Sequence, residues 1–273
     1  MKKTARLLLL LFVFLSSSLL TQAATPKEIP NWKKHFDDNH VTGSILIYSL
    51  KQNSYVGYNL ERCNVPISPA STFKIPNSLI ALESRITTLD EIFKWDGTPK
   101  PLEAWQQDLN LKDAFRVSAV PVYQEIARRV GVERMQKYVD LLDFGSVTVT
   151  ASNLDTFWLT DDCKITQFQQ VYFLKRLFNK ELPISLSVQK QVMDIMINEE
   201  NEQGVLYAKT GLNTGKNGNT GWFVGVYKYA GDTLIFATNI GPFSEDDNNR
   251  VIPIRINLTK LVLSELIENP SLF

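Results

Sequence analysis

The sequence predicts an α/β fold of the α+β type, with a five-stranded antiparallel sheet built from N- and C-terminal segments and covered by helices. Apolar strand segments occur near both ends of the chain, whereas apolar residues over roughly 70–200 recur at helical spacing. The links between successive strands are short, which favours hairpins over parallel crossovers. We therefore expect one sheet interrupted by a mainly helical insert.

Short apolar segments bounded by turn residues predict the five strands. A polar turn at 51–53 separates the first two strands, and Gly231-Asp232 indicates a hairpin between the last two. The expected strands cover 43–50, 55–58, 205–209, 221–229 and 233–239.

Helices are predicted where apolar residues repeat every three or four positions. The last of these helices is expected to end at Asn269-Pro270 and to cover one face of the sheet. The expected helices cover 73–82, 120–130, 132–142, 168–178, 188–197 and about 252–267.

The first 23 residues have the pattern of an export signal. Basic residues open the chain, an apolar run covers 7–20, and small residues lead to a cleavage site after Ala23. An uncleaved membrane anchor is the alternative, but about 14 apolar residues fall short of the roughly 20 that cross a bilayer. We therefore expect a signal peptide at 1–23 and a periplasmic or secreted domain at 24–273 without membrane segments.

Charge and histidine content exclude several classes of function. The 29 basic and 29 acidic residues are spread along the chain without a basic stripe, which argues against nucleic acid as a partner. The only histidines, His35 and His40, point from different faces of any helix or strand, so no metal site is expected. A hydrolase built from this chain needs a base other than histidine.

The two cysteines, Cys63 and Cys163, leave two alternatives open. In an oxidising compartment they could form a disulfide, or they could remain separate thiols, because distance along the sequence does not determine distance in space. Neither cysteine lies beside a catalytic motif. The sequence also leaves open whether the protein is a monomer or a dimer.

Ser71 and Lys74 are the first candidate catalytic pair. They are three residues apart at the start of a predicted helix, so their side chains share a face. Burial near Phe73 and Ile75 would lower the lysine pKa and leave a neutral amine able to take the hydroxyl proton. A capping serine followed by an exposed lysine has the same spacing, so this motif needs support from elsewhere in the chain.

That support comes from Lys209-Thr210-Gly211, which ends a predicted strand before a polar, Gly-rich loop at 213–220. The lysine and the hydroxyl can bind a substrate carboxylate, and the glycine lets the backbone approach the scissile carbonyl. Ser-x-x-Lys followed by Lys-Thr-Gly is the signature of penicillin-recognising serine enzymes.

With these motifs the chain resembles the class D, oxacillinase-type, serine β-lactamases over essentially all of 24–273. The resemblance implies the fold shared by serine β-lactamases and penicillin-binding proteins. Phe144-Gly145-Ser146 departs from the family's usual Tyr-Gly-Asn, which puts efficiency or substrate profile in doubt. The matching elements are Ser118-Ala-Val120, where related classes have Ser-x-Asn, Phe157-Trp158-Leu159, 221–225, and Arg255 upstream of Thr259-Lys260.

The resemblance implies the roles of three catalytic residues. Ser71 would attack the lactam carbonyl and form an acyl-enzyme. Lys74 would be carboxylated by carbon dioxide or bicarbonate to N6-carboxylysine and act as general base. Ser118 would pass a proton to the leaving nitrogen. No other cofactor is implied.

The resemblance also assigns binding roles, and two of them have plain alternatives. Trp158 and Leu159 could be ordinary core residues, and Arg250 competes with Arg255 for the substrate carboxylate. The implied oxyanion hole consists of the backbone N–H groups of Ser71 and Leu212. The implied carboxylate site is Lys209, Thr210, Gly211 and Arg255, and the implied carbamate pocket is Phe73, Val120, Trp158 and Leu159.

The expected function is hydrolysis of penicillin-type β-lactams, giving antibiotic resistance. The alternatives are a penicillin-binding peptidase or a sensor-like protein that is acylated without turnover, and a homologue that only binds. Val120 argues against the peptidase, and the single removable apolar segment argues against both the anchored peptidase and the membrane-bound sensor. Whether oxacillin, cephalosporins or carbapenems are substrates does not follow from the sequence.

Overall fold

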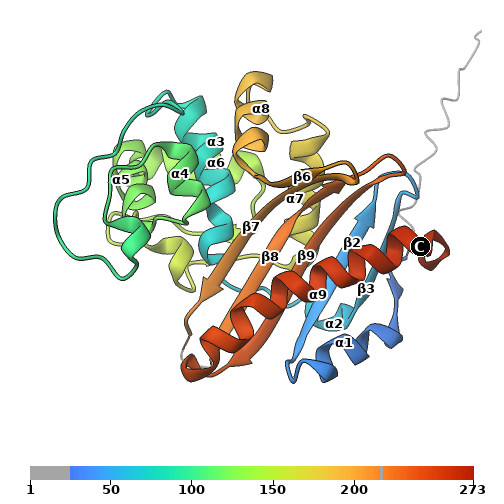
Figure 1. Ribbon diagram of the computed structural model, residues 1–273. Coiled ribbons are helices and arrows are strands. Elements are labelled where there is room, and N and C mark those ends of the chain that lie inside the picture. The colour runs from blue at the N-terminus through green and yellow to red at the C-terminus, as the bar shows by residue number, and fades with distance from the viewer. Residues whose placement is uncertain (1–24, 216–217) are drawn as a thin grey trace, which may run out of the picture.

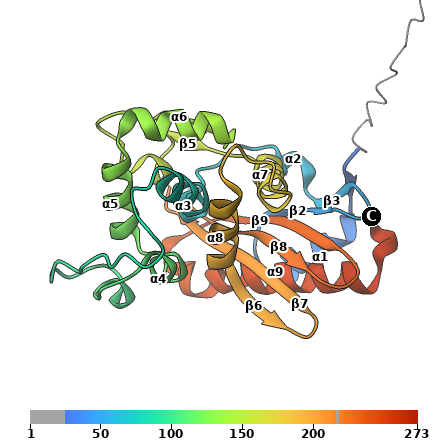
Figure 2. The same ribbon diagram turned by 90° about the horizontal axis from the view of Figure 1, so that it is seen from above.

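The computed structural model describes residues 25–215 and 218–273 (Figure 1). The expected signal peptide at 1–23 lies outside these residues. A mixed sheet forms the middle of the described protein, and helices cover both of its faces (Figure 2). None of the helices in the described ranges is long and apolar enough to cross a membrane.

The central sheet has seven strands in the order β1-β3-β2-β9-β8-β7-β6. Neighbouring strands are antiparallel except for β1, which runs parallel to β3. A separate two-stranded sheet joins β4 (Ser146–Val147) to β5 (Cys163–Lys164). The strands of the central sheet are β1 (Lys27–Glu28), β2 (Gly43–Ser49), β3 (Ser54–Tyr58), β6 (Ile197–Asn201), β7 (Gly204–Asn213), β8 (Asn219–Lys228) and β9 (Thr233–Phe243).

The sequence analysis predicts a five-stranded, all-antiparallel sheet. This prediction is wrong in the number of strands and in the direction of the edge strand β1. The five expected strands are present as β2, β3, β7, β8 and β9, but the two edge strands were missed. Both edge strands are exposed along their whole length and lack the alternation of apolar and polar residues that marks a strand. They form because a neighbouring strand offers unpaired backbone groups.

Strand β7 also extends beyond the expected end at Lys209. Its pairing with β8 continues to Asn213 opposite Thr220, so the Lys-Thr-Gly motif lies inside the strand. The expected loop at 213–220 is correspondingly shorter. Cross-strand pairing overrides the polar composition of this segment.

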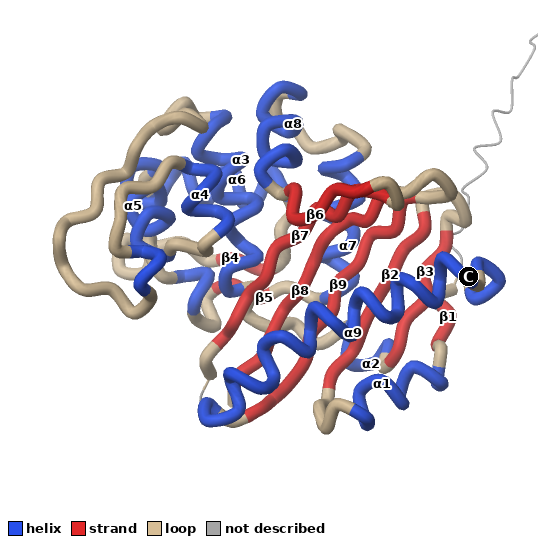
Figure 3. Tube along the Cα trace, viewed as in Figure 1, coloured by secondary structure: helices blue, strands red, loops and turns tan. Residues whose placement is uncertain are grey.

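The helical insert follows the apolar periodicity closely (Figure 3). Helices α5 and α6 have the expected bounds and meet at Gly131, whose φ of 81° suits glycine. The short α4 was missed, and α8 ends before Ile197 because that residue begins β6. The helices are α1 (Lys33–Asp38), α2 (Leu60–Cys63), α3 (Lys74–Glu83), α4 (Leu111–Arg116), α5 (Val120–Val130), α6 (Val132–Leu142), α7 (Gln167–Phe178), α8 (Leu186–Ile195) and α9 (Asn248–Glu268).

Alternate residues of β8 face two different cores. Trp222 and Val224 pack toward the helical insert, whereas Phe223 packs toward α9. Helix α9, longer than the expected 252–267, crosses the sheet face opposite the insert (Figure 1). On that face Leu258 and Val262 of α9 are buried against the strands. The candidate site therefore lies where the insert meets β7, on the face away from α9.

Candidate active site

The structure brings Ser71 and Lys74 into direct contact. Ser71 lies in a 3-10 turn, Ala70–Phe73, that leads into α3, and Lys74 is the first residue of that helix. The Lys74 amine Nζ donates a hydrogen bond to Ser71 Oγ at 2.9 Å. The serine is half-buried, and the lysine side chain is only 1% exposed. A buried amine thus touches a hydroxyl that a substrate can reach.

Hydrogen bonds hold the turn before Ser71 in one conformation. Ser68 Oγ donates to the carbonyl of Trp158, and the indole of Trp222 donates to the carbonyl of Ser68. Ala70 has a φ of 47°, which is unusual for a residue other than glycine. Such strain is typical of functional sites, where the surrounding structure fixes the backbone.

The environment of Lys74 favours the neutral amine. Burial lowers the lysine pKa from 10.5 to about 7, because water no longer solvates the ammonium. No carboxylate in the described ranges forms an ion pair with it, and Ser71 Oγ is its only hydrogen-bond partner there. A large share of Lys74 can therefore be unprotonated at neutral pH.

Phe73, the residue before this lysine, packs in a cluster of aromatic rings. Phe73 stacks on Trp158 with ring centroids 5.8 Å apart, and Phe157 meets Phe73 edge to face. Within the described residues, the Trp158 indole N–H is buried without an acceptor, which is rare for a buried donor. This observation favours a site role for Trp158 over plain packing. Val120 and Leu159 are half-buried.

Ser118 and Lys209 form a second contact in the same region. Lys209 Nζ donates to Ser118 Oγ at 3.0 Å and also to the carbonyl of Thr210. Burial holds the pKa of Lys209 well below its usual value, and the nearby positive charges of Lys74 and Arg255 lower it further. Ser118 has a φ of 58°, so it too has a strained backbone.

Gly211 lets β7 lie directly against the nucleophile turn. A Cβ atom at this position would be 2.8 Å from the carbonyl oxygen of Pro69, so any larger residue would push the strand and the turn apart. Leu212 follows in the strand, and β6 pairs with β7 only as far as Tyr207. The edge of β7 at Leu212 is therefore not covered by β6.

The two candidate arginines lie in different surroundings. Arg255 is 6% exposed and donates from Nη1 to the carbonyl of Gly211, whereas Arg250 is exposed and bonds to Asp247. Burial lowers the pKa of Arg255 to about 10, so its guanidinium stays charged at neutral pH. The position of Arg255 beside the Lys-Thr-Gly segment favours it over Arg250.

Sequence reasoning missed several residues that hold this site together. Ser78 Oγ donates to the backbone carbonyl of Lys74 and is hydrogen-bonded to the Tyr123 hydroxyl. Gln170 Nε2 donates to Thr72 Oγ1 at 2.7 Å. Ser78 is four residues after Lys74, so the helical spacing already placed it on the same face. Tyr123 and Gln170 come from other helices, and no local pattern points to them.

Phe144 of the unusual Phe-Gly-Ser element is part of the aromatic cluster. Its ring is fully buried and meets Phe73 and Phe173 edge to face. A Cβ atom on Gly145 would lie 2.3 Å from the carbonyl oxygen of Lys164, so the glycine is required by close packing. The element supports the turn behind the nucleophile.

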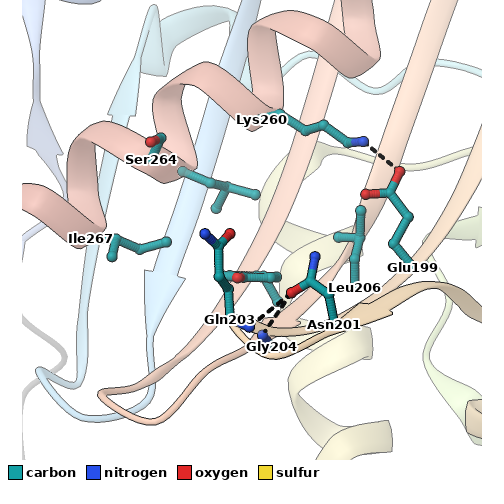
Figure 4. Close-up of a pocket in the computed structure, with 10 residues that line it drawn as sticks. Glu199, Asn201, Gln203, Gly204, Leu206, Lys260, Ser264 and Ile267 are labelled. Carbon is teal, nitrogen blue, oxygen red and sulfur yellow. Dashed lines mark hydrogen bonds and ion pairs between the residues drawn. The ribbon is translucent and has the colours of Figure 1, made fainter.

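Two cavities border the site, and another lies away from it. One of about 740 Å³ is lined by Ser68, Leu159 and Asn213 among others, and one of about 100 Å³ is lined by Lys209 and Thr210. Figure 4 shows a cavity of about 230 Å³ between α9 and the β6–β7 hairpin, where Lys260 pairs with Glu199. It contains none of the expected site residues.

The remaining expectations concern metals and thiols. Within 25–215 and 218–273, no group of three or more histidine, cysteine or acidic residues could hold a metal ion. Cys63 and Cys163 are separate, buried thiols rather than a disulfide. Burial raises the pKa of Cys63 to about 12, so this thiol is unreactive at neutral pH.

Comparisons with known proteins agree with this fold. A family model described as the penicillin-binding protein transpeptidase domain matches residues 21–248. β-Lactamase OXA-5 of Pseudomonas aeruginosa is 36% identical over 94% of this chain and 95% of its own length. β-Lactamase OXA-48 of Klebsiella pneumoniae is 35% identical over 95% and 98%.

Solved structures give the same result. A class D β-lactamase from Sebaldella termitidis superposes with a TM-score of 0.84 at 33% identity, over 89% of this chain and 98% of that chain. The class D β-lactamase YbXI from Nostoc has a TM-score of 0.83 at 39% identity, over 87% and 99%. The chain therefore belongs to the class D serine β-lactamases, as the sequence motifs indicate.

Proposed function

We propose that this protein hydrolyses the β-lactam ring of penicillin-type antibiotics through an acyl-enzyme on Ser71, and so gives antibiotic resistance. The observation that carries the proposal is the 2.9 Å contact between Ser71 Oγ and a buried Lys74 whose pKa is lowered to about 7. The curated relatives named as β-lactamases support the substrate class.

In acylation, Ser71 Oγ bonds to the lactam carbonyl carbon as its proton passes to the base at position 74. The carbon–nitrogen bond of the ring then breaks. The proton reaches the leaving nitrogen through the Ser118 hydroxyl, which is hydrogen-bonded to Lys209. In deacylation, water attacks the ester carbonyl, the base takes a proton from that water, and Ser71 Oγ regains a proton as the ester bond breaks.

Backbone and cationic groups stabilise the charges of this reaction. The N–H groups of Ser71 and Leu212 form the oxyanion hole, where one donor contributes about 10²- to 10³-fold in rate. Lys209, Thr210 and Gly211 face the substrate carboxylate, and Arg255 adds positive charge beside them. The contact between Gly211 and Pro69 keeps this strand close to the nucleophile.

The residues around Lys74 fit a carboxylated lysine. Lys74 is buried, its amine has a pKa of about 7, and the Trp158 indole has no acceptor among the described residues. A carbamate formed from carbon dioxide and the Lys74 amine, with release of one proton, would supply an anionic general base. Phe73, Val120 and Leu159 exclude water, and the Trp158 N–H orients the group.

We further propose that residues 1–23 are a cleaved signal peptide. The basic start, the apolar run and Ala23 support export, and the domain at 24–273 then acts in the periplasm or outside the cell. There it meets β-lactams before they reach their targets.

Steady-state hydrolysis of nitrocefin and benzylpenicillin by the purified mature protein tests the proposal. We expect many turnovers per enzyme, and no turnover in the Ser71→Ala variant. A single stoichiometric burst from the wild-type protein would instead identify a β-lactam sensor or a penicillin-binding peptidase.

A further inference from the structure

A chain of two hydroxyl groups connects α5 to the main chain of Lys74. The hydroxyl oxygens of Tyr123 and Ser78 are 2.9 Å apart, and Ser78 Oγ donates to the carbonyl oxygen of Lys74 at 2.8 Å. A serine hydroxyl has only one proton, and Ser78 donates it to the backbone carbonyl of Lys74. The Tyr123 hydroxyl must therefore be the donor to Ser78.

Both hydroxyl groups are buried, which limits the partners they can bond to. Tyr123 and Ser78 are both 0% exposed, and in the described ranges the tyrosine hydroxyl has no partner other than Ser78. Burial also raises the pKa of Tyr123, so the phenol stays a neutral donor. A buried donor without an acceptor is unfavourable, so the hydroxyl pair fixes the tilt of the tyrosine ring.

The ring so held covers one side of the lysine amine. Lys74 Nζ lies 5.2 Å from the centre of the Tyr123 ring, while its one hydrogen bond points to Ser71. The other charged group facing this amine is Lys209 of β7. The ring face is partly negative, so it disfavours an anionic group on its side of the amine.

We propose that the Tyr123–Ser78 hydroxyl pair is a positioning element that holds the tyrosine ring against Lys74 Nζ, excludes water from that side, and keeps the amine aimed at Ser71. The inference rests on the proposed function and deepens it by assigning the control of the base to two residues outside the motifs. Neither residue touches the substrate or the reacting atoms.

Three variants separate positioning from general stability. Ser78→Ala leaves the tyrosine hydroxyl buried without an acceptor, so the ring shifts or water enters. Tyr123→Phe keeps the ring and removes the hydroxyl. The double variant Ser78→Ala/Tyr123→Phe lacks the same pair, so it should add little to the effect of either single change. Tyr48→Phe is the matched control, because it removes another buried tyrosine hydroxyl, bonded to Asn53 and Lys175.

The first measurement is the titration of Lys74 in carbon dioxide-free buffer, followed by NMR of ¹³C-labelled lysine and assigned with Lys74→Ala. Because water stabilises the ammonium, we expect Ser78→Ala to raise the lysine pKa by about half a unit or more. Tyr123→Phe and the double variant should shift the pKa by the same amount as Ser78→Ala, to within about 0.2 units, because all three lose the same pair. Tyr48→Phe should leave the titration unchanged while lowering the melting temperature.

The second measurement is the carbamate signal of the full mature protein as ¹³C-labelled bicarbonate is added. We expect the half-saturating bicarbonate concentration to rise about fivefold in Ser78→Ala and by a similar factor in the double variant, which lacks the same pair. Equal effects of Ser78→Ala and Tyr48→Phe, or an effect of the double variant equal to the sum of the two single ones, would overturn the proposal. The lysine titration uses no substrate, so it can fail or succeed independently of β-lactam turnover.

Discussion

The two faces of the central sheet hold cores of different chemistry. On the insert face, Lys74 and Lys209 are buried without carboxylate partners, and Trp158 has an N–H group without an acceptor in the described ranges. On the opposite face, α9 packs Leu258 and Val262 against apolar strand residues. Lys260 of α9 keeps its charge at the surface in a pair with Glu199, and Arg255 is the buried charge of this helix.

This difference shows where the fold tolerates unfavourable burial. Desolvating an amine costs stability, and the compensating contacts come from the rest of the protein. Apart from Arg255, which bonds to Gly211, α9 contributes mostly apolar burial without such costs. Keeping two amines in a reactive state on the insert face lowers the stability of the fold. Such a loss of stability is common at active sites.

The largest expected effect follows from removing the buried amine of the insert face. Lys74→Ala should lower kcat for nitrocefin by about 10²- to 10⁴-fold, because no base remains to activate water for deacylation. Mass spectrometry of the intact protein should show acyl-enzyme that persists. Normal turnover by this variant would mean that another group is the base.

The second effect is a pH-dependent stability that the buried Lys74 of the insert face produces. The folded pKa of Lys74 is about 7 against 10.5 for an ordinary lysine, so between these values the unfolded chain binds a proton that the native protein does not. Stability should therefore rise with pH across this window and be lowest below about pH 7, where the buried ammonium is present in full.

Denaturant unfolding in carbon dioxide-free buffer, compared with Lys74→Met, measures this contribution. The unfolding free energy of the wild type minus that of the variant should increase by about 1.4 kcal/mol per pH unit between pH 7 and 10. Parallel curves for the two proteins would show that Lys74 titrates normally.

The smallest effect is expected on the α9 face. Lys260→Ala removes an exposed ion pair with Glu199, whose side chains are 41% and 49% exposed. Such pairs contribute about 0–1 kcal/mol, so the melting temperature should fall slightly and kcat should stay within about twofold. A large loss of activity would show that the two faces are coupled through α9.

Local patterns predicted much of the helical insert and the centre of the sheet. Helices α5 and α6 have a strong apolar face at helical spacing, so their bounds follow from the sequence. The edge strands β1 and β6 lack such a signal, because their residues are exposed on both faces. Their formation depends on the unpaired edges of β3 and β7.

The candidate site divides in the same way. The sequence by itself determined the pair of Ser71 and Lys74, because three residues in a helical turn share one face, and its motifs identified the family. Only the tertiary structure decided that Lys74 is desolvated, that Lys209 reaches Ser118, and that the two cysteines stay apart. These properties depend on which distant segments exclude water from a side chain or approach it, and no local pattern of residues contains that information.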